Sequence, residues 1–349
     1  MKKIMEKIKK FNFFGNRTIF YIVPLVIVLV MIVCGLCYQL GSSKQYFANI
    51  GIDFQGGTIL TIEFKDSAAN SANYKTNVEK ITQIAQEQQV TVSRNQSSGD
   101  SSIIVQYTNW NTGKGGSVNS ADDMNDINTA IQNKLYDMSQ KGEIDEIVEN
   151  GVNFSTIGNE SSKNLIKTSA IAVAIALVLM LLYIIIRFDF YSGLAAVIAL
   201  LHDVIIMISL TVIFYVEIGD SIVAGLITIV AYSINNTIVV FDRIRSVVKP
   251  LNKQRKKYEI EPIINNAITS TMTRTLYTTI TTLVVMVVLV AMGVASIITF
   301  GLPIIFGLIA GFYSSVFIAA PLWGEFKSIG ERIKIKRANK KFKKKQQRA

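Results

Sequence analysis

The sequence contains little cysteine, histidine or charge, and each shortage excludes a class of function. Its two cysteines, Cys34 and Cys37, lie in one apolar run, so the chain cannot build a disulfide framework. We interpret their CxxC spacing as two small apolar residues and not as a redox or metal pair. The single histidine, His202, comes with no nucleophile–base set, metal-ligand cluster or phosphate-binding loop. We therefore expect no enzyme, no catalytic residue, no metal and no cofactor.

What the sequence has in abundance is long apolar runs. Hydrophobic residues make up 50% of the 349 residues, against 17% charged. Six runs are long enough to cross a hydrocarbon core of about 30 Å at about 1.5 Å per helical residue. They cover residues 18–40, 165–186, 191–216, 219–241, 272–294 and 297–323. The first run is too long for a signal peptide and lacks a small-residue cleavage site, so we expect a retained helix. The runs predict a polytopic α-helical membrane protein with six transmembrane helices.

Charge is distributed unevenly and predicts the orientation in the membrane. Residues 41–164 contain nine Lys/Arg against fifteen Asp/Glu, about −6, so with a total of +11 the remainder carries about +17. The positive charge lies in residues 1–10, 243–257 and 334–348, beside apolar runs. Since cytoplasmic flanks are rich in Lys and Arg, we favour a topological role over nucleic-acid binding. For the basic tail, anionic lipid and ribosomes both remain open as contacts.

This orientation divides the chain into parts with both termini in the cytoplasm. The expected parts are a basic N-terminus at 1–17, a first transmembrane helix at 18–40, an extracytoplasmic domain at 41–164, a five-helix bundle at 165–323 with a cytoplasmic loop at 242–271, and a basic tail at 324–349. The outer domain alternates short β-rich runs with helix-like stretches. Strands are expected at 58–64, 90–94, 102–107 and 144–157, and helices at 69–89 and 121–140. The order β-α-β-β-α-β predicts an α+β ferredoxin-like ectodomain.

Polar residues inside the apolar runs are the candidate functional groups. They are His202 and Asp203, about 18 Å from the cytoplasmic end at helical rise, the amide pair Asn235 and Asn236, and Arg274. Ionisable groups at this depth are costly and usually face the bundle interior. A threonine stripe at 271, 275, 278 and 282 follows one face of the same helix as Arg274. We expect these groups to converge on one buried polar core. One alternative is that they form hydrogen bonds that only hold the bundle together. Another is that Arg274 extends its side chain to the lipid headgroups.

Four short motifs follow one another along the chain, at Gly51–Thr58, Leu201–Val204, Tyr232–Arg245 and Arg274–Leu276. Together they resemble the SecD/SecF family, accessory subunits of the Sec translocase. Gly51-Ile52-Asp53-Phe54-Gln55-Gly56-Gly57-Thr58 is similar to the signature that follows the first span in this family. Leu201-His202-Asp203-Val204, the run from Tyr232 to Arg245 that includes Asp242 and Arg243, and Arg274-Thr275-Leu276 are similar to three further motifs of the SecF branch. The resemblance covers nearly the whole chain, and SecD members would carry a much larger ectodomain. We do not assign a separate function to Asp242 and Arg243, which we interpret as an interfacial anchor and local ion-pair set.

The resemblance implies a partner and a mechanism. Members of this branch pair with SecD in a twelve-span bundle similar to the RND exporters, in the bacterial cytoplasmic membrane beside the SecYEG channel and YidC. The pair uses the proton motive force, or in some members a sodium gradient, to help secretory polypeptides complete translocation after the ATP-driven step of SecA. The partners implied are SecD, SecYEG, YidC, the translocating polypeptide and the lipid membrane, with no nucleic acid.

One position departs from the family pattern. The family usually has Asn-Asp where this chain has Asn235-Asn236, and an amide cannot take up and release a proton near neutral pH. Three hypotheses follow. In the first, which we favour, ion coupling depends on a carboxylate of SecD that pairs with Arg274. In the second, Asp203 has taken over part of the role of the family's acid. In the third, the chain has lost ion coupling and is a scaffold subunit.

Two other functions compete with ion-coupled protein translocation. An RND-like lipid or drug exporter half would have an ectodomain with an apolar tunnel, and usually two ectodomains on twelve spans in one chain. A pure docking protein of a membrane complex would be indifferent to replacement of Asp203 or Arg274.

Overall fold

The apolar runs form long helices because a backbone in hydrocarbon must satisfy its hydrogen bonds within the segment. The computed structural model describes residues 11–40, 47–65, 73–88, 90–98, 101–108, 121–254 and 258–346. Its long helices are α2 (Arg17–Leu40), α6 (Asn159–Arg187), α7 (Phe190–Ile213), α8 (Asp220–Lys253), α9 (Ile260–Ala291), and α10 (Ala295–Tyr313), which continues through the π-helix η1 (Ser314–Ala319) into α11 (Ala320–Gln346). Among the described residues, six helical segments are long and apolar enough to span a membrane, which agrees with the predicted number.

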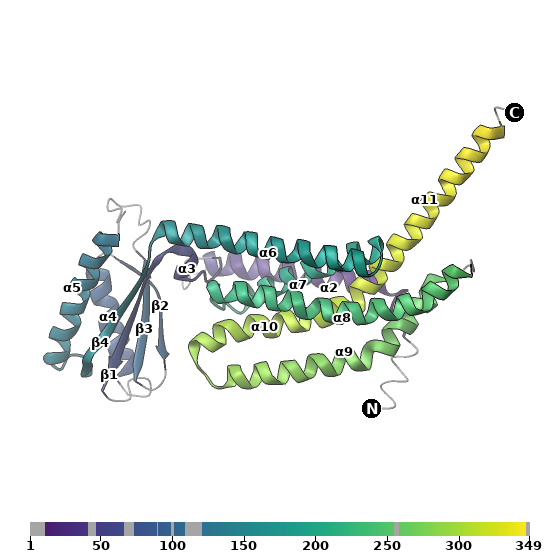
Figure 1. Ribbon diagram of the computed structural model, residues 1–349. Helices are drawn as coiled ribbons and strands as arrows, with labels where there is room; N and C mark the ends of the chain where they lie inside the picture. The colour runs from purple at the N-terminus through teal and green to yellow at the C-terminus, as the bar shows by residue number, and fades with distance from the viewer. Residues whose placement is uncertain are drawn as a thin grey trace.

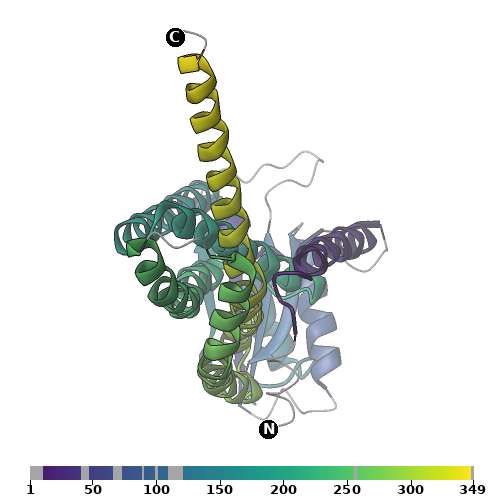
Figure 2. The same cartoon turned by 90° about the vertical axis from the view of Figure 1, so that its right-hand side faces the viewer.

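The helices form one bundle with a small α/β domain at one end (Figure 1). Helices α7, α8 and α10 lie at its centre, since α10 packs against α7, α8 and α9. Helices α2 and α6 bury little of their apolar surface within the chain, and α2 lies at the edge of the bundle (Figure 2). The basic ends of α8 and α11 lie opposite the small domain (Figure 1). The basic residues 1–10 fall outside the described residues.

The cytoplasmic loop expected at 242–271 is mostly helix. Helix α8 continues to Lys253 and α9 begins at Ile260, so the helices are interrupted only around 254–259. Helix α8 extends past its apolar run because Ile244 and Val248 keep the helical spacing of Phe241 and are buried in the same core. The apolar run therefore marks where the chain crosses the membrane but not where the helix ends.

In the described residues, the small domain is a four-stranded antiparallel sheet with two long helices and one helix of four residues. Its elements are α3 (Ile52–Gln55), β1 (Gly57–Phe64), α4 (Tyr74–Glu87), β2 (Thr91–Ser98), β3 (Ser102–Thr108), α5 (Ala121–Gln140) and β4 (Ile147–Ile157). The strand order is β2-β3-β1-β4. Alternate residues Leu60, Ile62 and Phe64 of β1 are buried in one core with Ile81 of α4 and Ile131 of α5, so both helices cover one face. The first of the two expected helices, α4, begins later than expected, at Tyr74, and residues 109–120 before α5 lie outside the described residues.

Two local features fix the centre of the bundle. Gly307 of α10 lies against Ile229 of α8 so closely that a Cβ there would be 2.4 Å from Ile229 Cγ1. This contact lets the two helices approach, as small residues do in membrane bundles. The π-helix η1 ends at Ala319, two residues before Pro321. The proline ring and its missing N–H disturb the preceding turn, and the wider π-helical turn accommodates them.

Candidate functional site: a buried carboxylate in the bundle

The carboxylate of Asp203 lies at the centre of the bundle and is 0% exposed. The hydroxyl groups of Ser233 in α8 and of Ser314 in η1 both donate to its Oδ2, the latter over 2.9 Å. Nδ1 of the neighbouring His202 lies 3.0 Å from its Oδ1. The His202 ring stacks on Tyr313 at a centroid distance of 5.9 Å. One acid on α7 is therefore held by groups from α8 and η1 as well as by its own neighbour.

A second layer of polar contacts surrounds this group. Thr237 and Ser315 form a hydroxyl–hydroxyl hydrogen bond of 3.0 Å between α8 and η1. Asn236, 2% exposed, donates through Nδ2 to Thr279 Oγ1 of α9 over 3.5 Å. The hydroxyl of Thr275, one turn before Thr279, is buried and pairs with no group of the described residues. The bundle core thus contains several separate side-chain hydrogen bonds in addition to those made by the Asp203 carboxylate.

The structure brings together only part of the predicted set. Asp203, His202 and Asn236 face the core, whereas Asn235 and Arg274 are exposed on the surface of the chain. The expected convergence is wrong for these two. Successive residues on an α-helix point about 100° apart. Asn236 and Thr275 face inward, and the 100° step carries Asn235 and Arg274, the residues before them, to the exposed side of their helices.

The threonine stripe is shifted from the predicted one. Thr271 and Thr275 are buried as expected, but the next buried threonine is Thr279. Thr278 is exposed and donates to carbonyls of its own helix. The buried threonines are therefore four residues apart, at 271, 275 and 279, and lie on the face of α9 that packs on α8. The predicted stripe alternated steps of four and three residues.

Several polar partners were not predicted from the sequence. They are Ser233, Thr237, Thr279, Ser314 and Ser315. A signal for two of them exists, because Ser233, Asn236 and Thr237 follow the i, i+3, i+4 spacing of one helical face within an apolar run. Small hydroxyl residues in such a run often contact another helix.

The Gly51–Thr58 motif lies at the junction between the small domain and the bundle. The Gly51 amide donates to the Ile218 carbonyl over 3.0 Å, and the Ile218 amide donates to Asn49 over 2.8 Å. The Asp53 carboxylate accepts from the amide of Asp220, the first residue of α8, over 3.1 Å. Burial raises the pKa of Asp53, and the nearby Asp220 carboxylate adds to this effect. The motif therefore couples the domain mechanically to the α7–α8 connection.

The two glycines of the motif are required by the backbone. Gly56 has φ 76° and Gly57 has φ 146°, a region that favours glycine. A Cβ on Gly57 would also lie 2.6 Å from the Tyr107 carbonyl of β3. The next residue, Thr58, is buried and forms a hydroxyl–hydroxyl hydrogen bond of 2.9 Å with Thr156 of β4. These residues start the central strand of the domain directly beside the membrane bundle.

Asp242 and Arg243 lie away from the buried carboxylate. Both are exposed at the end of the bundle opposite the small domain. Asp242 is 3.6 Å from Arg187, and Arg243 donates through Nε to Ser270 over 3.1 Å. They join α8 to its neighbours α6 and α9 and do not contact Asp203. Among the described residues, no cluster of His, Cys, Asp or Glu could hold a metal ion.

Two family models match the regions that carry these features. The SecD/SecF GG motif matches residues 49–68, and the C-terminal region of the protein export membrane proteins SecD/SecF matches residues 140–328. The chain belongs to the SecD/SecF family of protein export membrane proteins. Within this family its relatives are SecF subunits. The protein translocase subunit SecF of Helicobacter pylori is 30% identical over 292 residues, which cover 84% of this chain and 80% of that protein.

Other relatives are matched over a shorter region. The SecF subunit of Rickettsia felis is 34% identical over 189 residues, 54% of this chain and 56% of that protein. The match thus spans about half the length of this relative. A crystal structure of SecDF, a translocon-associated membrane protein from Thermus thermophilus, has a TM-score of 0.67 at 24% identity and covers 91% of this chain and 39% of that chain. A second SecDF structure, in a super-membrane-facing form, has a TM-score of 0.58 at 25% identity and covers 95% and 40%. With the six apolar helices, family membership identifies a multi-pass protein of the cytoplasmic membrane.

Proposed function

We propose that the chain is an accessory subunit of the Sec translocase that acts with SecD and uses a proton or sodium gradient to help secretory polypeptides complete translocation. Family membership supports the translocase role. The observation that carries the ion coupling is the fully buried Asp203, held between α7, α8 and η1.

Placing a carboxylate in the bundle core costs more free energy than holding the helices together with neutral hydroxyl groups. An acid at the centre of a membrane helix costs roughly 2.5–3.5 kcal/mol on insertion scales, whereas the Thr237–Ser315 pair joins α8 to η1 without charge. A carboxyl group can bind and release a proton when its donors move. Each donor to Oδ2 of Asp203 comes from a different element, so a relative motion of α7, α8 and η1 changes its surroundings. We propose that this motion links protonation of Asp203 to the movement of the bundle.

The exposure of Arg274 supports a role for the partner. Arg274 lies 17 residues before Ala291, the last residue of α9, which places it about 26 Å along the helix axis from that end. It forms no ion pair among the described residues, and Leu276 and Ile280 are exposed on the same helix. An arginine at this depth is stabilised by a carboxylate or by snorkelling. We propose that a carboxylate of SecD pairs with Arg274, while Asn236 supplies a hydrogen bond where the family has an acid.

The remaining partners follow from the proposed orientation. We propose that both termini and the basic ends of α8 and α11 are cytoplasmic and that the small domain lies outside, where it contacts the emerging polypeptide. SecYEG and YidC are proposed as neighbours in the same assembly. The firm contact between the Gly51–Thr58 motif and the α7–α8 connection gives the domain a route to follow motions of the bundle. No catalytic chemistry is proposed for the chain.

Pulse-labelled secretion in the native host tests the proposal. The chain is removed and replaced by the wild type, by Asp203→Asn, by Arg274→Gln, or by Asp126→Asn, an exposed carboxylate of α5 that serves as control. We expect removal, Asp203→Asn and Arg274→Gln to slow precursor export, and a protonophore (or a sodium ionophore, for a sodium-coupled subunit) to abolish the difference from wild type. Immunoblotting of membranes checks that each variant accumulates. If the slowing persists unchanged in uncoupled cells, the contribution is structural and ion coupling is rejected.

A further inference from the structure

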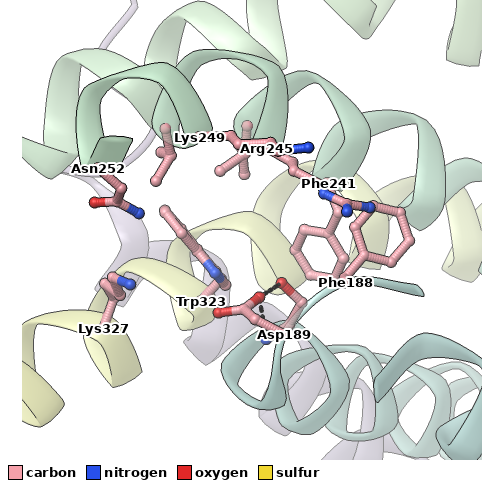
Figure 3. A pocket seen from close by; sticks show the side chains of 11 residues that line it. Phe188, Asp189, Phe241, Arg245, Lys249, Asn252, Trp323 and Lys327 are labelled. Atoms are coloured by element: carbon pink, nitrogen blue, oxygen red, sulfur yellow. Dashed lines mark hydrogen bonds between the residues drawn. The ribbon is translucent and has the colours of Figure 1, made fainter. Parts of the chain in front are cut away.

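A small basic pocket (Figure 3) is lined by α8 and α11 at the end of the bundle that lies opposite the small domain (Figure 1). It has a volume of about 200 Å³ and lies between the start of α7, the end of α8 and the start of α11. Arg245, Lys249 and Asn252 of α8 line one side (Figure 3), and Trp323 and Lys327 of α11 line the other. None of these residues contributes to the buried carboxylate site, and the proposed translocation function assigns them no role.

The pocket carries an excess of positive charge. Arg245, Lys249 and Lys327 line it together with a single acid, Asp189. Asp189 is the N-cap of α7, and its Oδ1 already accepts from the amide and the hydroxyl of Ser192. None of the three cations forms an ion pair with a carboxylate in the described part of the chain. The pocket is therefore a concentration of unneutralised positive charge.

The side chains of the pocket are held in place by packing and not by acids. Arg245 donates through Nη1 to the Arg187 carbonyl over 2.5 Å and lies 5.7 Å from the centroid of the Phe188 ring. Lys327 Nζ lies 5.9 Å from the centroid of the Tyr191 ring. Aromatic contacts of this kind orient a cation while leaving it available to an anion. Arg245 and Lys327 are thus oriented by their neighbours and remain available to bind an anion in the pocket.

The walls change from polar to apolar. Phe188, Phe241, Ile244, Val248 and Trp323 line the side toward the bundle, and Trp323 is only 3% exposed. This is the depth at which helices α6 and α7 meet and the apolar run of α8 gives way to charge. Aromatic residues with Lys and Arg mark the membrane–water interface. A ligand at this position has its charged part among the cations and an apolar part beside the bundle.

We propose that this pocket binds the phosphate headgroup of an anionic phospholipid from the cytoplasmic leaflet. Basic pockets between membrane helices on this side bind anionic headgroups. The volume is below the range of about 300–1,000 Å³ that takes drug-sized molecules, and so suits one headgroup with its acyl chains outside. A free phosphate ion carries the same negative charge but has no apolar part to contact the apolar wall. An acidic segment of a protein partner is the competing occupant.

Native mass spectrometry of the full-length chain in mild detergent tests the proposal. Phosphatidylglycerol is the probe, phosphatidylcholine is the neutral-headgroup comparison, and inorganic phosphate is the competitor. The pocket variant is Lys249→Gln/Lys327→Gln. The control is Lys253→Gln/Lys336→Gln, which removes the same charge from exposed positions of the same helices α8 and α11. At about 1 kcal/mol for each basic residue, we expect the pocket variant to bind phosphatidylglycerol roughly 30-fold more weakly and the control to bind like wild type.

The outcomes separate the occupants. Retention of binding by Lys249→Arg/Lys327→Arg supports the site, because it keeps both charges. Equal weakening by the pocket and control variants would show general surface attraction and overturn the proposal. Full displacement of phosphatidylglycerol by inorganic phosphate would assign the pocket to the free ion instead of lipid. Unchanged lipid binding, with loss of SecD on co-purification, would assign it to a protein contact. The inference rests on the proposed orientation but not on ion coupling, since lipid binding is measured without export.

Discussion

The hydrogen bond from Ser314 to Asp203 allows a direct test of how the buried carboxylate is held. In soluble proteins a hydrogen bond to a charged group contributes about 1.5–3 kcal/mol. In membrane bundles the average is about 0.6 kcal/mol and the maximum about 1.7 kcal/mol, because the unfolded chain in the membrane finds other partners. After Ser314→Ala, Asp203 keeps Ser233 and His202. We therefore expect the free energy of unfolding to fall by about 1 kcal/mol.

The assay is equilibrium unfolding of the purified chain in bicelles by titration with SDS. The matched control is Ser209→Ala, which removes an equally buried hydroxyl on α7 that donates only to the Ile205 carbonyl of its own helix. We expect almost no change for the control. A double-mutant cycle with Asp203→Ala isolates the pair, with an expected coupling energy of about 1 kcal/mol for Ser314 and near zero for Ser209. Equal losses for the two serine variants, or no coupling between Ser314 and Asp203, would refute the reasoning.

Two further predictions use other parts of the structure. Because burial raises the pKa of Asp53, the folded chain binds a proton at a pH where the unfolded chain has released it, so stability falls as the pH rises through this window. Asp53→Asn should flatten this fall in thermal unfolding across pH, and Asp126→Asn should leave it in place. Gly307→Val would place a Cβ 2.4 Å from Cγ1 of Ile229, which is closer than van der Waals contact. It should cost roughly 1–3 kcal/mol in the same unfolding assay, and Ile229→Ala should recover part of the loss; no recovery would mean that this contact does not set the helix separation.

The six spans could be predicted from the sequence because burial in lipid requires long apolar runs whatever the neighbouring helices do. The helix ends could not, because they depend on tertiary packing. Helix α8 continues to Lys253 since Ile244 and Val248 fit against the bundle, beyond the point where hydropathy falls. The element order of the small domain could be predicted for the same reason as the spans: alternation in β1 and helical spacing in α4 each indicate one buried face.

The candidate site was predictable only in part. Asp203 stands out because a carboxylate in an apolar run is costly and therefore rare. Its hydroxyl partners do not, since serine and threonine are common in membrane helices. Ser314 and Ser315 are both buried although they are adjacent. Both lie in the π-helical turn η1, whose wider turn departs from the 3.6-residue period.

The amide pair shows why two of the five predicted polar residues lie on the surface. Asn236 is satisfied inside this chain by Thr279, and Asn235, one residue earlier, is exposed on the other side of the same helix. Arg274 is likewise exposed, so the chain keeps an acid, Asp203, in its interior and a guanidinium on its surface. Had these two groups met, they would have neutralised each other within one chain. Kept apart, they leave an arginine that would gain from a carboxylate on another helix, and we propose that SecD supplies this carboxylate.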